Sequence, residues 1–140
     1  MAYFISIVLI FSAAVSPPTE NIEMSFLQNN PKMLYQWFSS RSSINISLPD
    51  PISFSDQLSH QQAYFLWKNI FASYLTFEFY SEEEYSLSSE KNNLILKTRW
   101  SFKNKKTNNQ YVFHVFFYLT KTAMPLETSW KITEIKAEKI

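Results

Sequence analysis

Few residues in this chain have side chains suited to acid-base or metal chemistry. The histidines are His60 and His114, the aspartates are Asp50 and Asp56, and Glu82–Glu84 form the one acidic run. His114 shares a predicted strand face with apolar neighbours, where a lone histidine is more often packed and hydrogen-bonded than a general base. His60 and the acidic run are predicted to be solvated. No histidines or carboxylates have metal-ligand spacing, so we predict no metal and no cofactor.

The absence of two residue types excludes several further kinds of catalytic and binding site. The chain has no cysteine, which excludes disulfides, thiol catalysis and cysteine-rich zinc sites. It also has no glycine, which excludes the phosphate loop, the dinucleotide fingerprint, the nucleophile elbow and the EF-hand loop. Turns that need a positive φ must use asparagine, and Asn29-Asn30, Asn92-Asn93 and Asn108-Asn109 stand where turns are expected. We therefore predict a protein that is not an enzyme.

The composition is that of one compact domain. The 140 residues are 46% apolar and 18% aromatic, which is enough to build a core. The formal charge of +1 provides no field that would attract nucleic acid. A small basic group at Lys103, Lys105 and Lys106 lies in a predicted hairpin loop and lacks interleaved aromatic residues, so we predict no nucleic-acid partner.

The N-terminus has the pattern of a targeting segment. Ala2–Phe11 is apolar apart from one serine, and Ser12-Ala13-Ala14 would suit cleavage before Val15. We predict a signal peptide over 1–14, a spacer over 15–20, a mature domain over 21–140, and export to the periplasm or the exterior of a bacterium. The apolar run is too short for a stable membrane span. The alternative is a buried first helix or strand in a protein that stays in the cytoplasm.

Apolar periodicity predicts three helices. The first covers 19–28, and the second begins at Pro31, whose fixed φ suits a first helical position. The third follows Ser59, which has Gln62 at capping-box spacing. Its apolar residues recur at helical spacing up to Tyr74: Ala63, Leu66, Trp67, Ile70, Phe71 and Tyr74. From Leu75 the period becomes two, so this helix must pass into a strand within two or three residues.

Alternating residues predict the strands. They cover 43–48 before the third helix, and then 75–80, 93–103, 111–119 and 130–137 after it. Residues 111–119 are apolar on both faces, which indicates a central strand. The alternation changes parity near Thr133-Glu134, which indicates a bulge. The order ααβαββββ predicts an α+β fold, a conical roll with three N-terminal helices packed on one face of a curved antiparallel sheet.

Three stretches carry a resemblance to a known family. They are Asn30 with Leu34–Phe38 at the helix-helix corner, Ser59–Ala63 before the aromatic helix, and Trp130–Ile135 in the last strand. Here the chain resembles the nuclear-transport-factor-2-like superfamily of cystatin-like α+β rolls. Within it, the chain looks most like the exported bacterial family named domain of unknown function 4783. The resemblance covers about Asn21 to Ile140, and none of the three stretches is a catalytic motif.

The resemblance implies a cavity between the helices and the sheet. Superfamily members include enzymes, ligand binders and interaction domains, so the fold does not decide the function. The candidate ligand-binding residues are Tyr64, Trp67, Trp100, His114 and Phe116, whose rings would either line the cavity or fill it. We expect a non-enzymatic binding or protein-interaction domain, with a homodimer through the outer sheet face as one form of interaction. The alternatives are a carrier of a small apolar ligand and an acid-base enzyme.

Overall fold

The computed structural model of the chain describes residues 16–86, 92–123 and 128–140. The predicted signal peptide and its cleavage before Val15 lie outside these residues. The elements, in chain order, are α2 (Thr19–Leu27), α3 (Pro31–Tyr35), β1 (Ile44–Leu48), β2 (Phe54–Leu58), α4 (His60–Ser73), β3 (Tyr74–Ser86), β4 (Asn93–Asn104), β5 (Gln110–Ala123) and β6 (Thr128–Lys139). In the described part of the chain, no helix is long and apolar enough to cross a membrane.

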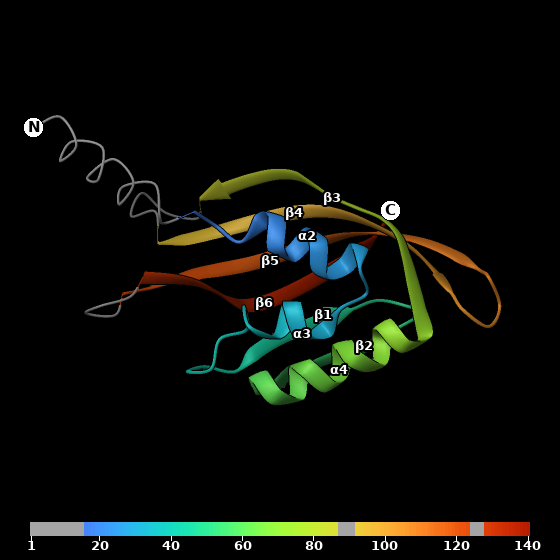
Figure 1. Cartoon of the computed structure of the whole chain (residues 1–140), viewed down its shortest axis with the longest axis horizontal. Coiled ribbons are helices and arrows are strands. Elements are labelled where there is room, and N and C mark those ends of the chain that lie inside the picture. The colour runs from blue at the N-terminus through green and yellow to red at the C-terminus, as the bar shows by residue number, and fades with distance from the viewer. Residues whose placement is uncertain (1–15, 87–91, 124–127) are drawn as a thin grey trace, which may run out of the picture.

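The strands form one six-stranded sheet with the order β2-β1-β6-β5-β4-β3 (Figure 1). Side chains on one face of β4 and β5 are buried beneath the helices, and the alternate residues are mostly half-exposed. The helices of the described residues therefore cover one face of the sheet, and the predicted α+β roll is confirmed. One pairing differs from the prediction, because β1 and β6 run parallel while the other neighbouring strands are antiparallel.

Strand β2 was not predicted from the sequence, so the element order is ααββαββββ rather than ααβαββββ. The strand lies at the edge of the sheet, and only its end residues Phe54 and Leu58 are half-buried. Its three central residues are polar and exposed, so the stretch shows no alternation of apolar and polar residues. The strand exists because its backbone pairs with β1, and this pairing does not require apolar and polar residues to alternate along the sequence.

The passage from α4 to β3 occurs within one residue, as Tyr74 both caps the helix and begins the strand. Asn29 stabilises this junction from the corner between α2 and α3, where its φ is 50°. Its Nδ2 donates to the carbonyl oxygens of Phe71, at 3.0 Å, and Tyr74, at 2.8 Å. Its Oδ1 accepts from the backbone N–H of Thr76 at 3.1 Å. An asparagine therefore supplies both the left-handed turn expected of it and the cap of another helix.

The predicted starts of α3 and α4 are confirmed by their caps. The Ser59 hydroxyl accepts from the N–H of Gln62 at 3.2 Å, and the Gln62 side chain accepts from the N–H of Ser59 at 3.0 Å. Asn30 caps α3, in which Pro31 is the first residue. Helix α2 begins at Thr19, and Pro18 is already buried. Thr19 and Glu20, the last residues of the predicted spacer over 15–20, therefore belong to α2.

Pairing with the sheet near β6 determines where α3 ends and where the last strand has its bulge. Helix α3 is short, because the chain beyond Tyr35 turns to run beside β6. The N–H of Ile132 donates to the carbonyl of Trp37 at 2.7 Å, and the N–H of Ser39 donates to the carbonyl of Ile132 at 3.0 Å. The predicted bulge in the last strand is confirmed, because the register against β5 shifts at Thr133.

Candidate functional site

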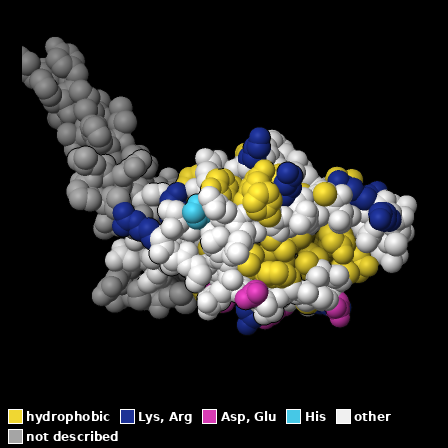
Figure 2. All heavy atoms as spheres, turned by 90° about the horizontal axis from the view of Figure 1, so that it is seen from below, with side chains coloured by type: hydrophobic (Ala, Val, Ile, Leu, Met, Phe, Trp, Pro, Cys, Tyr) yellow, Lys and Arg dark blue, Asp and Glu magenta, His cyan; other side chains and the backbone are white. Residues whose placement is uncertain are grey.

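Tyr64 lies in an aromatic groove at the surface between α3 and α4. The groove has a volume of about 650 Å³ and is lined by Lys32, Tyr35, Gln61, Tyr64 and Phe65. Seen from the side on which α4 lies, the surface carries a cluster of hydrophobic side chains with Lys and Arg side chains close to it (Figure 2). This groove is one of two candidate sites, and we call it the α3–α4 groove.

The rings around this groove form a continuous series. The ring of Tyr35 stacks on that of His60 with centroids 5.6 Å apart, and it meets Tyr64 edge-on at 5.3 Å. Tyr64 meets Phe65 edge-on at 5.4 Å. Phe65 ends the series with 59% of its surface exposed, which is high for a phenylalanine. The helical spacing of α4 places Gln61, Tyr64 and Phe65 on its solvent side, with Lys68 one turn further on.

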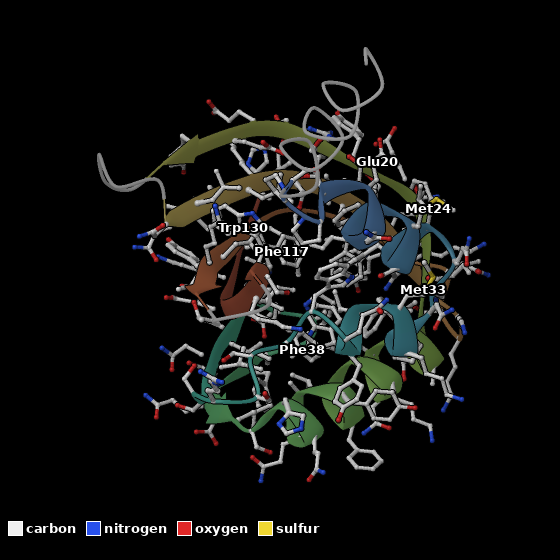
Figure 3. The ribbon with its side chains drawn as sticks, turned by 60° about the vertical axis from the view of Figure 1, so that its left-hand side comes forward. Glu20, Met24, Met33, Phe38, Phe117 and Trp130 are labelled. Carbon is white, nitrogen blue, oxygen red and sulfur yellow. The ribbon has the colours of Figure 1, made fainter. Side chains whose placement is uncertain are left out.

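Trp67 and Trp100 do not line a hollow, because both are fully buried in the core. Phe26 of α2 packs against both, with its ring centroid 5.2 Å from each, and the two tryptophan rings are 6.0 Å apart. Phe26 also stacks on Phe79 at 4.2 Å and meets Phe117 edge-on at 5.7 Å. Phe38, Phe117 and Trp130 point into the same interior, whereas Met24 lies on the outer side of α2 (Figure 3). The predicted rings were expected either to line a cavity or to fill the cone. These two tryptophans fill the cone.

The two buried tryptophans differ in how their indole N–H groups are satisfied. The Nε1 of Trp100 donates to the hydroxyl of Thr76 at 2.9 Å. The Nε1 of Trp67 is buried with no hydrogen-bond partner among the described residues. A buried donor without a partner costs free energy, so the contribution of Trp67 to stability comes from the packing of its ring.

His114 and Phe116 lie on β5 and point to the opposite face of the sheet from the helices. We call this the outer face. It consists of three rows of side chains that cross β3, β4, β5 and β6: Tyr80–Arg99–His114–Glu138, Glu83–Lys97–Phe116–Lys136, and Tyr85–Ile95–Tyr118–Glu134. Phe116 and Tyr118 are half-exposed, and Tyr80 and Tyr85 are exposed by 43% and 40%. The five predicted residues thus occupy three separate places: the core, the α3–α4 groove and the outer face.

A histidine-carboxylate pair on the outer face was missed by the sequence analysis. The Nε2 of His114 lies 3.0 Å from Oε1 of Glu82, with side-chain exposures of 26% and 31%. Glu82 is the extra residue at a register shift in β3. At the bulge Glu82 and Glu83 both lie on the outer face, and the side chain of Glu82 reaches His114 on β5. The acidic run that was predicted to be only solvated also includes Glu84, which accepts a hydrogen bond from the Thr19 hydroxyl, so two of its residues have specific partners.

Other charges on the outer face are paired loosely. Arg99 Nε lies 3.9 Å from Oε1 of Glu78, and the same oxygen accepts a hydrogen bond from the Ser101 hydroxyl at 3.0 Å. Burial raises the pKa of Tyr118, and the charges of nearby Glu134 and Glu138 add to this increase. Tyr118 therefore stays protonated, with a neutral hydroxyl, at physiological pH. No group of three or more histidine, aspartate or glutamate residues arranged to hold a metal ion occurs in the described ranges.

Comparison with solved structures places this architecture in a known class. The chain has the nuclear-transport-factor-2-like, cystatin-like roll. A DUF4783 family protein from Bacteroides ovatus superposes with a TM-score of 0.64 at 15% identity, covering 86% of this chain and 93% of that one. The ketosteroid isomerase-like protein from Erwinia carotovora atroseptica superposes at 0.63 with 14% identity, covering 84% and 86%.

Proteins of other kinds share the fold equally well. The yeast UBP3-associated protein BRE5 superposes with a TM-score of 0.62 at 10% identity, covering 86% of this chain and 72% of that one. No protein-family model and no curated protein matches the sequence. At these identities the likeness concerns the fold, so the resemblance expected from the sequence is confirmed at that level.

Proposed function

We propose that this protein is a non-enzymatic interaction domain that pairs with a second copy of itself through the outer face. The observation that carries the proposal is the composition of that face. It presents half-exposed and exposed aromatic rings among charges of both signs, on the side of the sheet away from α2, α3 and α4. Aromatic residues and arginine are enriched in protein interfaces, and a face whose charges complement themselves suits a two-fold dimer.

The positions of the charges support a particular arrangement. Arg99 on β4 and Glu138 on β6 lie on opposite sides of His114 in the same row. A two-fold axis parallel to β5 would bring β4 of one copy over β6 of the other, so that Arg99 would face Glu138 of the second copy. The same axis would bring Lys97 over Lys136, which is unfavourable. We therefore expect that this lysine pair weakens the dimer.

The size of the face also indicates a weak dimer. Three rows about 6.8 Å apart and four strands about 4.8 Å apart span about 400 Å². Stable complexes bury about 800 Å² on each partner, so we expect an equilibrium between monomer and dimer rather than a permanent assembly.

The filled cone supports a non-catalytic role. In this fold, a reaction between helices and sheet would need a hollow. Here the packed rings of Phe26, Phe79 and Trp100 occupy that space. The similar structures include one named isomerase-like and one named for its association with another protein, so they support either role equally. A carrier of an apolar ligand inside the cone meets the same obstacle.

Sedimentation velocity over a concentration series tests the pairing. The series should extend to about 1 mM, because so small an interface is expected to bind weakly. We expect the average mass of the wild type to rise with concentration. Phe116→Glu should remove this rise, because it would bury charges at the centre of the face. Lys136→Glu should increase it at low salt, because Lys97 would then face a carboxylate. Phe65→Glu, in the α3–α4 groove, is the matched control and should behave like the wild type.

A wild type that stays monomeric at all these concentrations would refute the pairing. An unchanged association of the Lys136→Glu variant would refute the arrangement about β5 while leaving the outer face as the interface. Circular dichroism of each variant would show that its fold is kept, because all three substituted side chains are at least partly exposed.

We also propose that the protein is exported with cleavage before Val15. The support is the apolar run Ala2–Phe11 followed by small residues. Mass spectrometry of the protein from its native host tests this proposal. A mature chain that begins at Val15 would support export, and a chain that retains residues 1–14 would contradict it.

A further inference from the structure

We infer that the α3–α4 groove is a binding site for a small aromatic carboxylate. The site is separate from the outer face, and the inference does not depend on the pairing proposed above. Its volume of about 650 Å³ lies within the roughly 300–1,000 Å³ typical of small-molecule sites. A ligand with one or two rings would fit this volume.

The rings of the groove define the apolar part of the ligand. His60, Tyr35, Tyr64 and Phe65 form a series of ring contacts with centroids between 5.3 and 5.6 Å apart. The series ends at Phe65, which has its ring largely in water. An aromatic ring placed against Phe65 would extend the series and remove apolar surface from water. An edge-on or offset ring pair would add roughly two- to twelvefold in affinity beyond the effect of area burial. The ligand is therefore expected to be aromatic rather than aliphatic.

The charges of the groove define the polar part. Lys32 is the one ionised side chain that lines it, and Lys68 lies one helical turn beyond Tyr64 on the same side of α4. Neither ammonium group forms an ion pair with any residue of the described ranges. No carboxylate lines the groove. A carboxylate on the ligand would complement Lys32 directly, and the Gln61 amide can donate a further hydrogen bond.

The charges of the groove disfavour other ligands of similar size. A cationic ring would be repelled by Lys32 and Lys68, and a zwitterion would bring an ammonium group close to the same lysines. A neutral ring would leave the lysines unpaired. We therefore expect an anionic ring compound to bind more tightly than its neutral or zwitterionic analogue.

Isothermal titration calorimetry with phenylacetate, phenylacetamide and phenylalanine tests the inference on the full chain. We expect phenylacetate to bind about two- to fivefold more tightly than the neutral amide or the zwitterionic amino acid, as follows from one solvent-exposed ion pair with Lys32. Lys32→Gln should remove this preference and leave the weaker binding of the ring. Phe65→Ala should weaken all three compounds. Phe116→Glu, on the outer face, should bind phenylacetate like the wild type.

Three results would overturn the inference. The first is equal binding of phenylacetate and phenylacetamide, which would show that Lys32 does not select the anion. The second is binding of phenylacetate that Phe65→Ala leaves unchanged, which would place the compound elsewhere. The third is no detectable binding of phenylacetate by a folded protein. Because Lys32 and Phe65 are exposed, their variants are expected to fold. Sedimentation of the same samples would show whether the proposed dimer still forms, independently of ligand binding.

Discussion

Replacing Asn29 by alanine should destabilise the domain more than a substitution of most half-exposed residues. The side chain makes three hydrogen bonds to backbone groups at the α4–β3 junction, with lengths of 2.8 to 3.1 Å. At about 1 kcal/mol each, their loss costs about 3 kcal/mol. The φ of 50° adds about 1 kcal/mol, because alanine tolerates the left-handed region poorly.

The expected total is about 4 kcal/mol, a large part of the roughly 5–15 kcal/mol by which a domain is stable. Urea unfolding followed by circular dichroism measures this loss directly. Asn29→Gly is the matched control, because glycine accepts the positive φ but makes none of the side-chain bonds. It should recover about 1 kcal/mol relative to alanine, since only the backbone part of the cost is relieved.

Two results would refute this reasoning. If the alanine variant unfolds within about 0.5 kcal/mol of the wild type, Asn29 is not what stabilises the junction. If glycine restores full stability, the hydrogen bonds contribute nothing and only the backbone conformation matters. The expected order of stability is therefore wild type, then the glycine variant, then the alanine variant.

Three further changes follow from single contacts. Trp100→Phe should cost about 1–2 kcal/mol more than Trp67→Phe in urea unfolding, because it leaves the buried hydroxyl of Thr76 without its donor, while Trp67 loses no hydrogen bond. Equal costs would contradict this. Ser59→Ala should cost about 1 kcal/mol through loss of the α4 cap, and no change in midpoint would speak against the capping box. The pKa of Tyr118 is raised in the folded state above its ordinary value of 10.0, so the folded state holds this proton more tightly and stability falls as pH rises beyond that value. Tyr118→Phe should lessen the fall in thermal midpoint above pH 10, and an unaltered fall would show that other groups cause it.

The sequence by itself determined the local structure wherever burial or capping imposes a pattern. The capping box at Ser59, the helical spacing through Phe71 and the change of period at Leu75 all predicted elements that the structure contains. The bulge at Thr133 was visible as a change of parity, because every residue after it faces the opposite side. These patterns arise because a helix face or a strand face either touches the core or does not.

The tertiary structure alone decided where the candidate site residues lie. Strand β2 pairs through its backbone, and its exposed side chains carry no period. The partner of His114 could not be found by counting along the strands, because two register shifts in β3 alter which residue faces it. Tyr64 and Trp67 are three residues apart on one helix, yet one lines a surface groove and the other is fully buried.

The physical reason is that an aromatic side chain has the same favourable transfer free energy in a core, in a groove or in an interface. Composition therefore indicates that rings will be buried, and it does not indicate what will bury them. For this protein the packing of α2 across the sheet assigned Trp67 and Trp100 to the core. The same packing left Phe65 and Phe116 to face solvent, and it is these rings that the proposed ligand and the proposed second copy would cover.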